Sequence, residues 1–406
     1  MNRTPTSRSA AAARTDSGPP ALSVAEGRFS RLEAIEWWDQ ARLARARILV
    51  IGAGALGNEV VKNLALLGVG RVAIADMDRV ELSNLSRSVL FRETDEGRFK
   101  AECAAAAARR IFDGVQATAL VGNILADLGL GWFRWADVVI GALDNREARV
   151  FVNAACARVG RPWIDGGIEV LHGVVRGFAP PETACYECTM SQVDWDLLNK
   201  RRSCSLLARR ALAQRGTPTT PTTASVIGAL QVQETVKLLH GRGALLGRGF
   251  VFDGAEHASF VSQYPVNPDC PWHEPPAAIE PLPQFGSGTR LRDLWQEAAR
   301  RLGGVDAIDF AREIVERLEC PGCGRREDVF LPAEKVGEDR LRCPCGAESA
   351  ASFLHSLSEK SAALDRTVRD AGLPAWEIVW ARRGDRVLGL ELAGDNPFAG
   401  PSGPAR

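Results

Sequence analysis

The sequence lacks the features that would place a protein in a membrane, outside the cell or on nucleic acid. Its 406 residues include 50 basic and 50 acidic side chains, so the formal net charge is zero. That balance excludes the broad cationic field of a general binder of nucleic acids or anionic membranes. No apolar run approaches the ~18 residues that cross a bilayer, and no apolar signal segment begins the chain. We therefore expect a cytoplasmic protein with reduced thiols, and neither a nucleic acid nor a membrane as its partner.

Lysine and histidine are scarce as well. Only six of the 50 basic residues are lysines, so a lysine inside a motif stands out. The five histidines supply no evident cysteine–histidine pair of the kind that activates a thiol nucleophile. The composition, 46% hydrophobic and 25% charged, is otherwise that of an ordinary globular protein.

Composition along the chain predicts two folded regions between disordered ends. At ~100–200 residues per domain, the length suggests two or three domains. Residues 1–26 are rich in Arg, Ser, Ala, Pro and Gly; organellar transit peptides share this composition, but we favour a disordered tail. We expect a first domain over 27–273, a proline-rich linker over 274–290, a smaller second domain over 291–399 and a disordered end over 400–406.

The first domain opens with a strand, a glycine turn, a helix and a second strand. The apolar run Arg47–Ile51 leads into the turn 52–57, and after a helical pattern the apolar run Arg71–Ala75 ends in an aspartate. Such apolar strands are typical of a parallel sheet buried on both faces. Further strands are expected over 117–121, 137–142 and 162–165, and helices over 30–46 and 147–159. The sequence thus predicts an α/β fold: a doubly wound, Rossmann-like, mostly parallel sheet with a smaller C-terminal region.

The glycine turn predicts a site for phosphate groups. Gly52, Gly54 and Gly57 let the backbone approach phosphates closely and point the N-terminus of a helix at their charge. Asp76, at the end of the second strand, fits a ligand of ribose hydroxyls. This pattern does not choose between NAD and ATP, and a tight turn with no ligand stays open as an alternative.

Two groups of cysteines have the spacing of zinc ligands. Cys185 and Cys188 form one pair, and Cys270 with His273 forms its complement far downstream, so together they supply four tetrahedral ligands. The alternative is two unrelated cysteine pairs. The second group has a glycine after each pair, which is typical of a zinc ribbon; a redox dithiol or inert thiols are the alternatives. This group consists of Cys320, Cys323, Cys343 and Cys345.

Three cysteines fall outside these groups. Cys103 and Cys156 lie in helical patterns and are expected to be small core residues. Cys204 instead lies in a polar, arginine-rich segment, where Arg201 and Arg202 should favour its thiolate. A surface cysteine without chemistry is the alternative for Cys204.

Several motifs in order resemble one known superfamily. They are the run 76–87 (Asp-Met-Asp-Arg-Val-Glu-Leu-Ser-Asn-Leu-Ser-Arg), a following lysine at 100, the run 144–149 (Asp-Asn-Arg-Glu-Ala-Arg), and 28–31 (Arg-Phe-Ser-Arg). Over about residues 28–273 the chain resembles ubiquitin-activating enzymes and the sulfur-carrier adenylyltransferases of thiamine and molybdopterin biosynthesis. Its zinc-ribbon region is reminiscent of activating enzymes of bacterial ubiquitin-like conjugation systems. Ser86 and Ser88 depart from the family's usual Asn and Gln, and His273 from its usual Cys.

The resemblance implies roles for individual residues. Arg87 and Lys100 would hold the triphosphate of ATP, Asp144 would bind Mg²⁺, and Arg31 would reach into the partner subunit of a homodimer. The implied nucleotide ligands are Gly52, Gly54, Gly57, Asp76, Asp78, Asn84, Arg87, Lys100, Asp144 and Asn145. The implied catalytic residues are Arg31, Arg87, Lys100, Asp144 and Cys204.

The resemblance also implies an activity. The expected reaction is adenylation of the C-terminal glycine of a ubiquitin-like protein, followed by a thioester on Cys204 and transfer to a conjugating enzyme. A sulfur-carrier adenylyltransferase shares the adenylation residues but forms no such thioester. A tRNA-modifying dehydratase would need a basic face, which zero net charge does not favour. A binding module without activity would be expected to have lost Arg87, Lys100 or Asp144, and all three are present.

Overall fold

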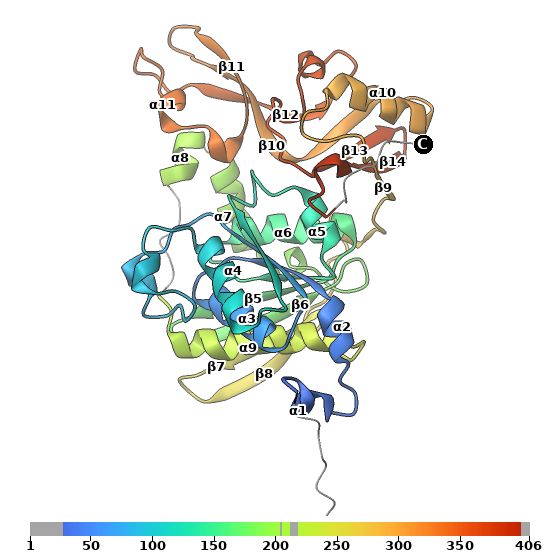
Figure 1. The fold of residues 1–406 in the computed structure, drawn as a ribbon. Helices are drawn as coiled ribbons and strands as arrows, with labels where there is room; N and C mark the ends of the chain where they lie inside the picture. Colours follow the sequence, from blue (N-terminus) through green and yellow to red (C-terminus); the bar gives the residue numbers. More distant parts are fainter. Residues whose placement is uncertain (1–26, 204, 212–217, 399–406) are drawn as a thin grey trace, which may run out of the picture.

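The computed structural model describes residues 27–203, 205–211 and 218–398 (Figure 1). The expected tails 1–26 and 400–406, and Cys204, lie outside the described residues. The chain forms an eight-stranded sheet with helices on both faces, and a second, six-stranded sheet lies beside it at the top of Figure 1.

The large sheet is parallel on one side and antiparallel on the other. Its order is β3-β2-β1-β4-β5-β6-β7-β8; β1 to β5 run parallel, and β5 to β8 pair antiparallel. The strands are β1 (Arg47–Ile51), β2 (Arg71–Asp76), β3 (Gln116–Val121), β4 (Val138–Gly141), β5 (Trp163–Glu169), β6 (His172–Phe178), β7 (Arg248–Asp253) and β8 (Ala258–Gln263). This arrangement confirms the predicted doubly wound, mostly parallel fold.

Helices cover both faces because the central strands are apolar on both sides. Ile48 and Val50 of β1 pack on one side of the sheet and Leu49 and Ile51 on the other, as the alternation of strand side chains requires. The first face is covered by α3 (Ala55–Leu66), α4 (Lys100–Ile111) and α9 (Pro221–Leu239). The second face is covered by α5 (Leu130–Trp135) and α6 (Arg146–Val159).

The single helix expected over residues 30–46 is wrong. The structure has two short helices there, α1 (Ser30–Glu33) and α2 (Gln40–Arg45). Asp39 begins the second one, because its side chain accepts a hydrogen bond from the backbone amide of Arg42 at 2.9 Å. A local capping bond therefore interrupts a pattern that has helical spacing.

The smaller sheet contains most of the C-terminal region. Its order is β11-β10-β13-β14-β9, and β12 also pairs with β10. The strands are β9 (Ile279–Pro281), β10 (Ala307–Glu319), β11 (Arg326–Pro332), β12 (Ala350–Leu357), β13 (Ile378–Arg383) and β14 (Arg386–Glu391). Its helices are α10 (Leu291–Leu302) and α11 (Glu338–Leu341).

Part of the segment expected to be a linker belongs to this sheet. Within 274–290, β9 pairs in parallel with β14, and Leu282, which follows it, is fully buried. The three residues of β9 form an edge strand, a position that tolerates proline. The segment therefore joins the two regions through a packed strand.

The two regions share an apolar interface. The ring of Trp132 on α5 packs against that of Trp376 at a centroid distance of 5.1 Å, and both lie in one buried cluster with Ile378. The crossover between β6 and β7 also reaches the small sheet. Its first two helices are α7 (Gln192–Ser203) and α8 (Leu206–Ala211), and Leu206 lies in a cluster with Val315 and Leu318 of β10.

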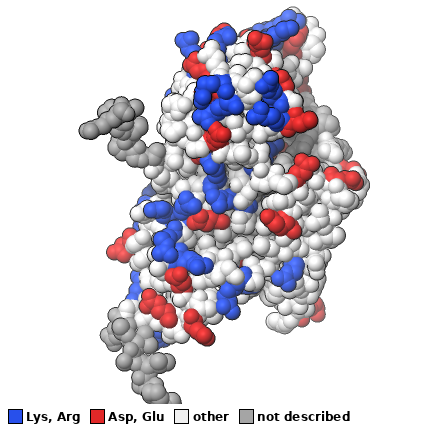
Figure 2. All heavy atoms as spheres, turned by 90° about the vertical axis from the view of Figure 1, so that its right-hand side faces the viewer, with Lys and Arg blue, Asp and Glu red and all other residues white. Residues whose placement is uncertain are grey.

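Charges of both signs are mixed on the face that carries α10 and the β13–β14 hairpin. Figure 2 shows acidic side chains beside the basic ones there. Between neighbouring strands, Arg382 of β13 pairs with Asp309 of β10 at 3.1 Å. Among the described residues, no helix combines the length and the apolar composition that crossing a bilayer requires.

Candidate functional site

A cleft of about 1310 Å³ lies at the carboxyl ends of the parallel strands. The strand order reverses between β1 and β4, and doubly wound sheets bind their ligands at such a switch point. Gly52 follows β1, Asp76 ends β2 and Asp144 follows β4, and all three line the cleft. Chain segments far apart in sequence therefore meet at one sheet edge.

The three glycines of the turn, Gly52, Gly54 and Gly57, have different structural roles. A Cβ on Gly57 would lie 2.0 Å from the carbonyl oxygen of Gly52, and one on Gly52 would lie 2.2 Å from that of Ala142. Gly52 also has φ of +96°, which favours glycine. A Cβ on Gly54 would meet nothing within 4 Å, and this glycine lines the cleft at the start of α3. Gly52 and Gly57 thus allow close packing, whereas Gly54 leaves space for a ligand such as a phosphate.

Asp76 is held in place by two backbone amides. Its Oδ2 accepts a hydrogen bond from the amide of Ala53 at 2.6 Å, and its Oδ1 accepts one from the amide of Asp78 at 2.8 Å. Burial raises the pKa of this carboxyl despite the two amide donors, which act in the opposite direction. The carboxylate thus has a fixed orientation at the cleft wall.

Two cations lie on the same side of the cleft as Asp76. The Nζ atom of Lys100 forms an ion pair with Asp78 at 2.9 Å, and Arg87 donates to the carbonyl oxygen of Ser83 at 2.8 Å. Both cations line the cleft, and the lysine side chain is 13% exposed. Asn84 is buried beneath them, where its side chain accepts from the amide of Glu81 at 3.1 Å.

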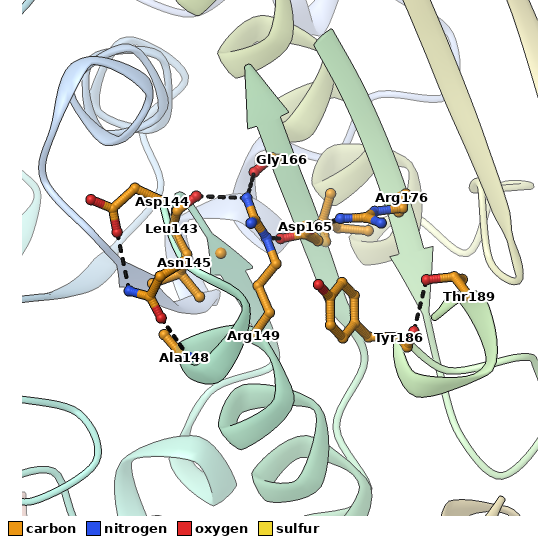
Figure 3. Close-up of polar contacts among 12 residues, drawn as sticks. Leu143, Asp144, Asn145, Ala148, Arg149, Asp165, Gly166, Arg176, Tyr186 and Thr189 are labelled. Carbon is orange, nitrogen blue, oxygen red and sulfur yellow. Dashed lines mark hydrogen bonds and ion pairs between the residues drawn. The ribbon is translucent and has the colours of Figure 1, made fainter. Parts of the chain in front are cut away.

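The motif that begins α6 also lines the cleft (Figure 3). The side chain of Asn145 accepts from the amide of Ala148 at 2.8 Å, which caps the helix, and donates to Asp144 at 3.1 Å. The Asp144 carboxylate lines the cleft with the two cations, and it is the kind of oxygen ligand that Mg²⁺ prefers. The residues present therefore fit a Mg²⁺ ion carried with phosphate groups.

A buried charge network behind this wall is a feature that the sequence reasoning missed. Arg149 donates to Asp165 at 2.9 Å and to the carbonyl oxygens of Leu143 and Gly166 at 2.6 and 3.0 Å (Figure 3). Arg176 donates to the other carboxylate oxygen of Asp165 at 3.0 Å. Arg149 lies in the motif 144–149, but its partner Asp165 is 16 residues away, so only a long-range signal could have assigned this contact.

Several predicted residues do not reach the cleft. Most predicted nucleotide ligands line it, but among the described residues Gly57, Asn84 and Arg31 are not part of its wall. Gly57 and Asn84 support the turn and the loop from behind. Arg31 is exposed on α1. Cys204 lies outside the described residues.

The structure brings the first predicted zinc group together. The ligand atoms of Cys185, Cys188, Cys270 and His273 all lie within 4.8 Å of one another. Cys185 Sγ is 3.8 Å from Cys188 Sγ and 3.5 Å from Cys270 Sγ, close to the ~3.8 Å between thiolates on a tetrahedral zinc ion. The Nδ1 atom of His273 faces the carbonyl oxygen of Pro181 at 3.3 Å, which leaves Nε2 for a metal. These four residues fit a structural zinc ion.

The second group is also assembled, next to the C-terminal end of β10. Cys320 Sγ lies 3.4 Å from Cys345 Sγ, and Cys323 Sγ lies 3.6 Å from Cys343 Sγ. All four ligand atoms lie within 4.8 Å of one another. Four thiolates at this spacing fit a zinc ribbon. Cys103 and Cys156, predicted to be core residues, are both buried.

Fold and cleft together define a doubly wound α/β protein with a phosphate-type glycine turn at its switch point. The sequence pattern of the ThiF family matches residues 28–272, which is more than half of the chain. The chain therefore belongs to the ThiF family.

Known relatives include both enzyme types that the sequence resembles. The NEDD8-activating enzyme E1 catalytic subunit of Caenorhabditis elegans is 42% identical over 161 residues, covering 36% of this chain and 37% of the relative. The adenylyltransferase and sulfurtransferase MOCS3 of Mus musculus is 40% identical over 149 residues, covering 37% of this chain and 32% of the relative. The chain thus spans about a third of the length of these relatives. The SAMP-activating enzyme E1 of Haloferax volcanii is 31% identical over 240 residues, covering 57% of this chain and 82% of the relative.

The solved structures share the fold at lower identity. A crystal structure of E. coli MccB with ATP matches with a TM-score of 0.52 and 22% identity, covering 62% of this chain and 75% of that one. A structure of the same protein in complex with N-formylated MccA matches with a TM-score of 0.51. These matches show a common fold.

Proposed function

We propose that the chain uses ATP to adenylate the C-terminal glycine of a ubiquitin-like protein. One observation carries this proposal: the cleft brings together the open turn at Gly54, the fixed carboxylate of Asp76, the cations Arg87 and Lys100, and the carboxylate of Asp144. These groups match the phosphates, ribose and metal ion of Mg²⁺-ATP in chemistry and in order along the sheet edge. Membership of the ThiF family and the three relatives named above support the same activity.

The reaction needs a site that overcomes repulsion between two anions. The glycine carboxylate oxygen attacks the α-phosphorus of ATP, the bond from that phosphorus to the bridging oxygen breaks, and pyrophosphate leaves with the electron pair. Arg87 and Lys100 would neutralise the phosphate oxygens as charge develops, with Lys100 exchanging its ion pair to Asp78 for the ligand. When bound, Mg²⁺ supplies further positive charge, and Asp144 is the residue that would hold it.

The remaining part of the cleft fits an extended glycine-rich tail. Beyond Asp144, the wall includes Gly167 and Gly173 on β5 and β6, and the proposed path of the tail follows the backbone of these two strands. The guanidinium of Arg149 lies beside this path, fixed by Asp165. A chain end without bulky side chains would reach the nucleotide there.

The fate of the acyl-adenylate is the second half of the proposal. Cys204 would attack the acyl carbon as a thiolate, AMP would leave, and the ubiquitin-like protein would remain as a thioester for a conjugating enzyme. Arg31 would complete the site of a partner subunit in a homodimer. The similarity to the mouse sulfurtransferase favours one alternative, in which the same adenylate serves a sulfur-carrier protein.

The adenylation step is tested by ATP–pyrophosphate exchange. Purified protein, Mg²⁺-ATP and ubiquitin-like proteins that end in glycine should support exchange, and Lys100→Ala should lower it at least ~100-fold. Lys360→Ala is the matched control, because Lys360 is an exposed lysine of the C-terminal region that does not line the cleft. Equal exchange by both variants would overturn the role given to Lys100, and no exchange with any candidate would overturn adenylation.

The thioester step has its own readout. A covalent adduct on a non-reducing gel should disappear with thiol reagent and in Cys204→Ala, but persist in Cys103→Ala, whose cysteine is buried in α4. Exchange without an adduct, together with dependence on sulfide or persulfide, would replace the thioester with sulfur-carrier chemistry.

A further inference from the structure

The loop after β3 forms the cleft wall beyond the proposed ribose site. Gly122, Asn123, Ile124 and Leu125 all line the cleft. Because β3 lies next to β2 in the sheet, a nucleotide whose phosphates are at the glycine turn and whose ribose is at Asp76 extends its base over this loop. The shape of the loop therefore determines how the adenine base is received.

A residue of the C-terminal region holds this loop. Arg312, on β10, donates through Nη1 to the carbonyl oxygen of Leu125 at 2.7 Å and through Nη2 to that of Leu128 at 3.0 Å. The same guanidinium donates through Nε to Glu377 at 2.8 Å. One side chain thus binds two loop carbonyls and a carboxylate at the same time.

Glu377 continues the contact from the other side of the loop. Its Oε1 accepts hydrogen bonds from the amide of Leu130 at 3.1 Å and from the amide of Ile378 at 2.9 Å. The side chains of Arg312 and Glu377 are only 2% and 1% exposed. A buried ion pair contributes little net stability compared with apolar packing, but its hydrogen bonds have strict geometry. Here that geometry fixes both ends of the segment 125–130.

Neighbouring residues of the C-terminal region reach the cleft itself. In the short 3₁₀ helix η5 (Ala333–Lys335), Glu334 lines the cleft, and Lys335 forms an ion pair with Asp127. Asp127 in turn accepts a hydrogen bond from the amide of Asn123 at 2.9 Å. The C-terminal region therefore contacts the loop at its middle as well as at its end.

We propose that the C-terminal region completes the adenosine side of the nucleotide site, with Arg312 as the residue that positions the loop. This inference rests on the proposed function, because it takes the ligand of the cleft to be ATP. It gives the small sheet a role in nucleotide binding besides its zinc group.

The test compares two arginine-to-lysine variants of the same strand. Arg312→Lys keeps the charge beside Glu377, but a single ammonium cannot span the three acceptors that the guanidinium reaches. Arg317→Lys is the matched control, because Arg317 also lies on β10 but pairs with Asp328 in an exposed ion pair. For each full-length variant, calorimetry measures the Kd for Mg²⁺-ATP alone, and hydrogen exchange reports on residues 122–130.

The expected results separate the two variants. Arg312→Lys should weaken ATP binding about 10-fold, the equivalent of one charged hydrogen bond, and should speed hydrogen exchange in residues 122–130. Arg317→Lys should change neither quantity. If Arg312→Lys has both the ATP affinity and the hydrogen exchange of the wild type, the positioning role is overturned while the proposed function stays intact. If the wild-type chain binds no ATP, both the positioning role and the proposed function are overturned. In that case ATP–pyrophosphate exchange would already have failed to show adenylation.

A second variant keeps the test decisive if Arg312→Lys does not fold. Lys335→Glu places a like charge beside Asp127, and because the Lys335 side chain is 45% exposed, losing this ion pair should cost only about 0–1 kcal/mol of stability. ATP binding should weaken about 3–5-fold, within the range for a screened surface charge pair, and faster exchange should again be confined to 122–130. Unchanged ATP binding and unchanged exchange in this variant would count against the proposal.

Discussion

The carboxylate of Asp165 is fully buried, and it lies 2.9 Å from the Nε atom of Arg149, which lines the cleft. Its second oxygen accepts from Arg176, so one anion fixes two arginines. The position of the Arg149 guanidinium beside the proposed substrate path is therefore set by a residue that does not itself line the cleft.

Removing this anion should cost both stability and activity. Asp165→Asn leaves two cations without a buried counter-charge, so the free energy of unfolding should fall by about 3–5 kcal/mol. ATP–pyrophosphate exchange should fall as well, because Arg149 loses its anchor. Asp309→Asn, which breaks an exposed pair with Arg382, should cost less than about 1 kcal/mol and spare exchange. Equal effects in both variants, measured by urea unfolding, would contradict this account.

The glycine turn predicts opposite results for two neighbouring substitutions. In Gly57→Ala the added methyl would lie 2.0 Å from a backbone oxygen, so stability should fall by about 1–3 kcal/mol. In Gly54→Ala the methyl meets nothing within 4 Å, and the cost should stay near ~1 kcal/mol or below, as for a changed N-cap. ATP affinity should nevertheless fall at least ~10-fold in Gly54→Ala, because the methyl occupies the phosphate space. Calorimetry and urea unfolding would separate the two effects, and a stable Gly54→Ala with full affinity would contradict the assignment.

The raised pKa of Asp76 predicts how the stability of the protein without bound ligand changes with pH. A carboxyl whose pKa is raised by burial contributes stability that is fully present below its unfolded value, near ~3.9, and is lost as pH rises through the folded pKa. Wild type should therefore gain stability relative to Asp76→Asn as pH falls through that window. Urea unfolding of both proteins at a series of pH values measures the difference. A difference that instead grows toward neutral pH would contradict the burial of this group as its cause.

The two cysteine groups predict two independent metal sites. Full-length protein should contain two zinc ions, one for each group, and Cys185→Ser and Cys323→Ser should each contain one. Cys103→Ala, which changes a buried thiol outside both groups, should retain both ions. Elemental analysis of the purified proteins measures the number of zinc ions per chain in each variant. Loss of both ions in either single variant would show that the sites depend on each other.

The parallel half of the large sheet was predictable because its strands are local apolar runs. The segments 47–51 and 71–75 are each apolar after an initial arginine and are followed by a glycine turn or an aspartate, so their position and their role at the sheet edge follow from short-range pattern. The cleft residues at the strand ends were found for the same reason. The cysteine groups were found from spacing within each pair.

The contacts that complete the site are not local. Arg312 and Glu377 are separated by 65 residues, and each by itself reads as an ordinary surface charge. The strand β9 has only three residues and a proline, too short for a period-2 pattern to appear. The break between α1 and α2 depends on one capping bond at Asp39. Such features depend on which segments of the chain come into contact in the folded protein. The sequence pattern of a single segment does not contain this information.

The tryptophan contact between the two regions also determines how the chain can be divided. A fragment that ends at residue 273 would retain Trp132 but lose Trp376 and Ile378, which share its buried cluster. Its newly uncovered apolar surface would promote self-association, since exposed patches of this kind are aggregation sites. The boundary that composition suggests is therefore a poor place to cut. Truncated proteins made for crystallisation or assay should keep both sheets together.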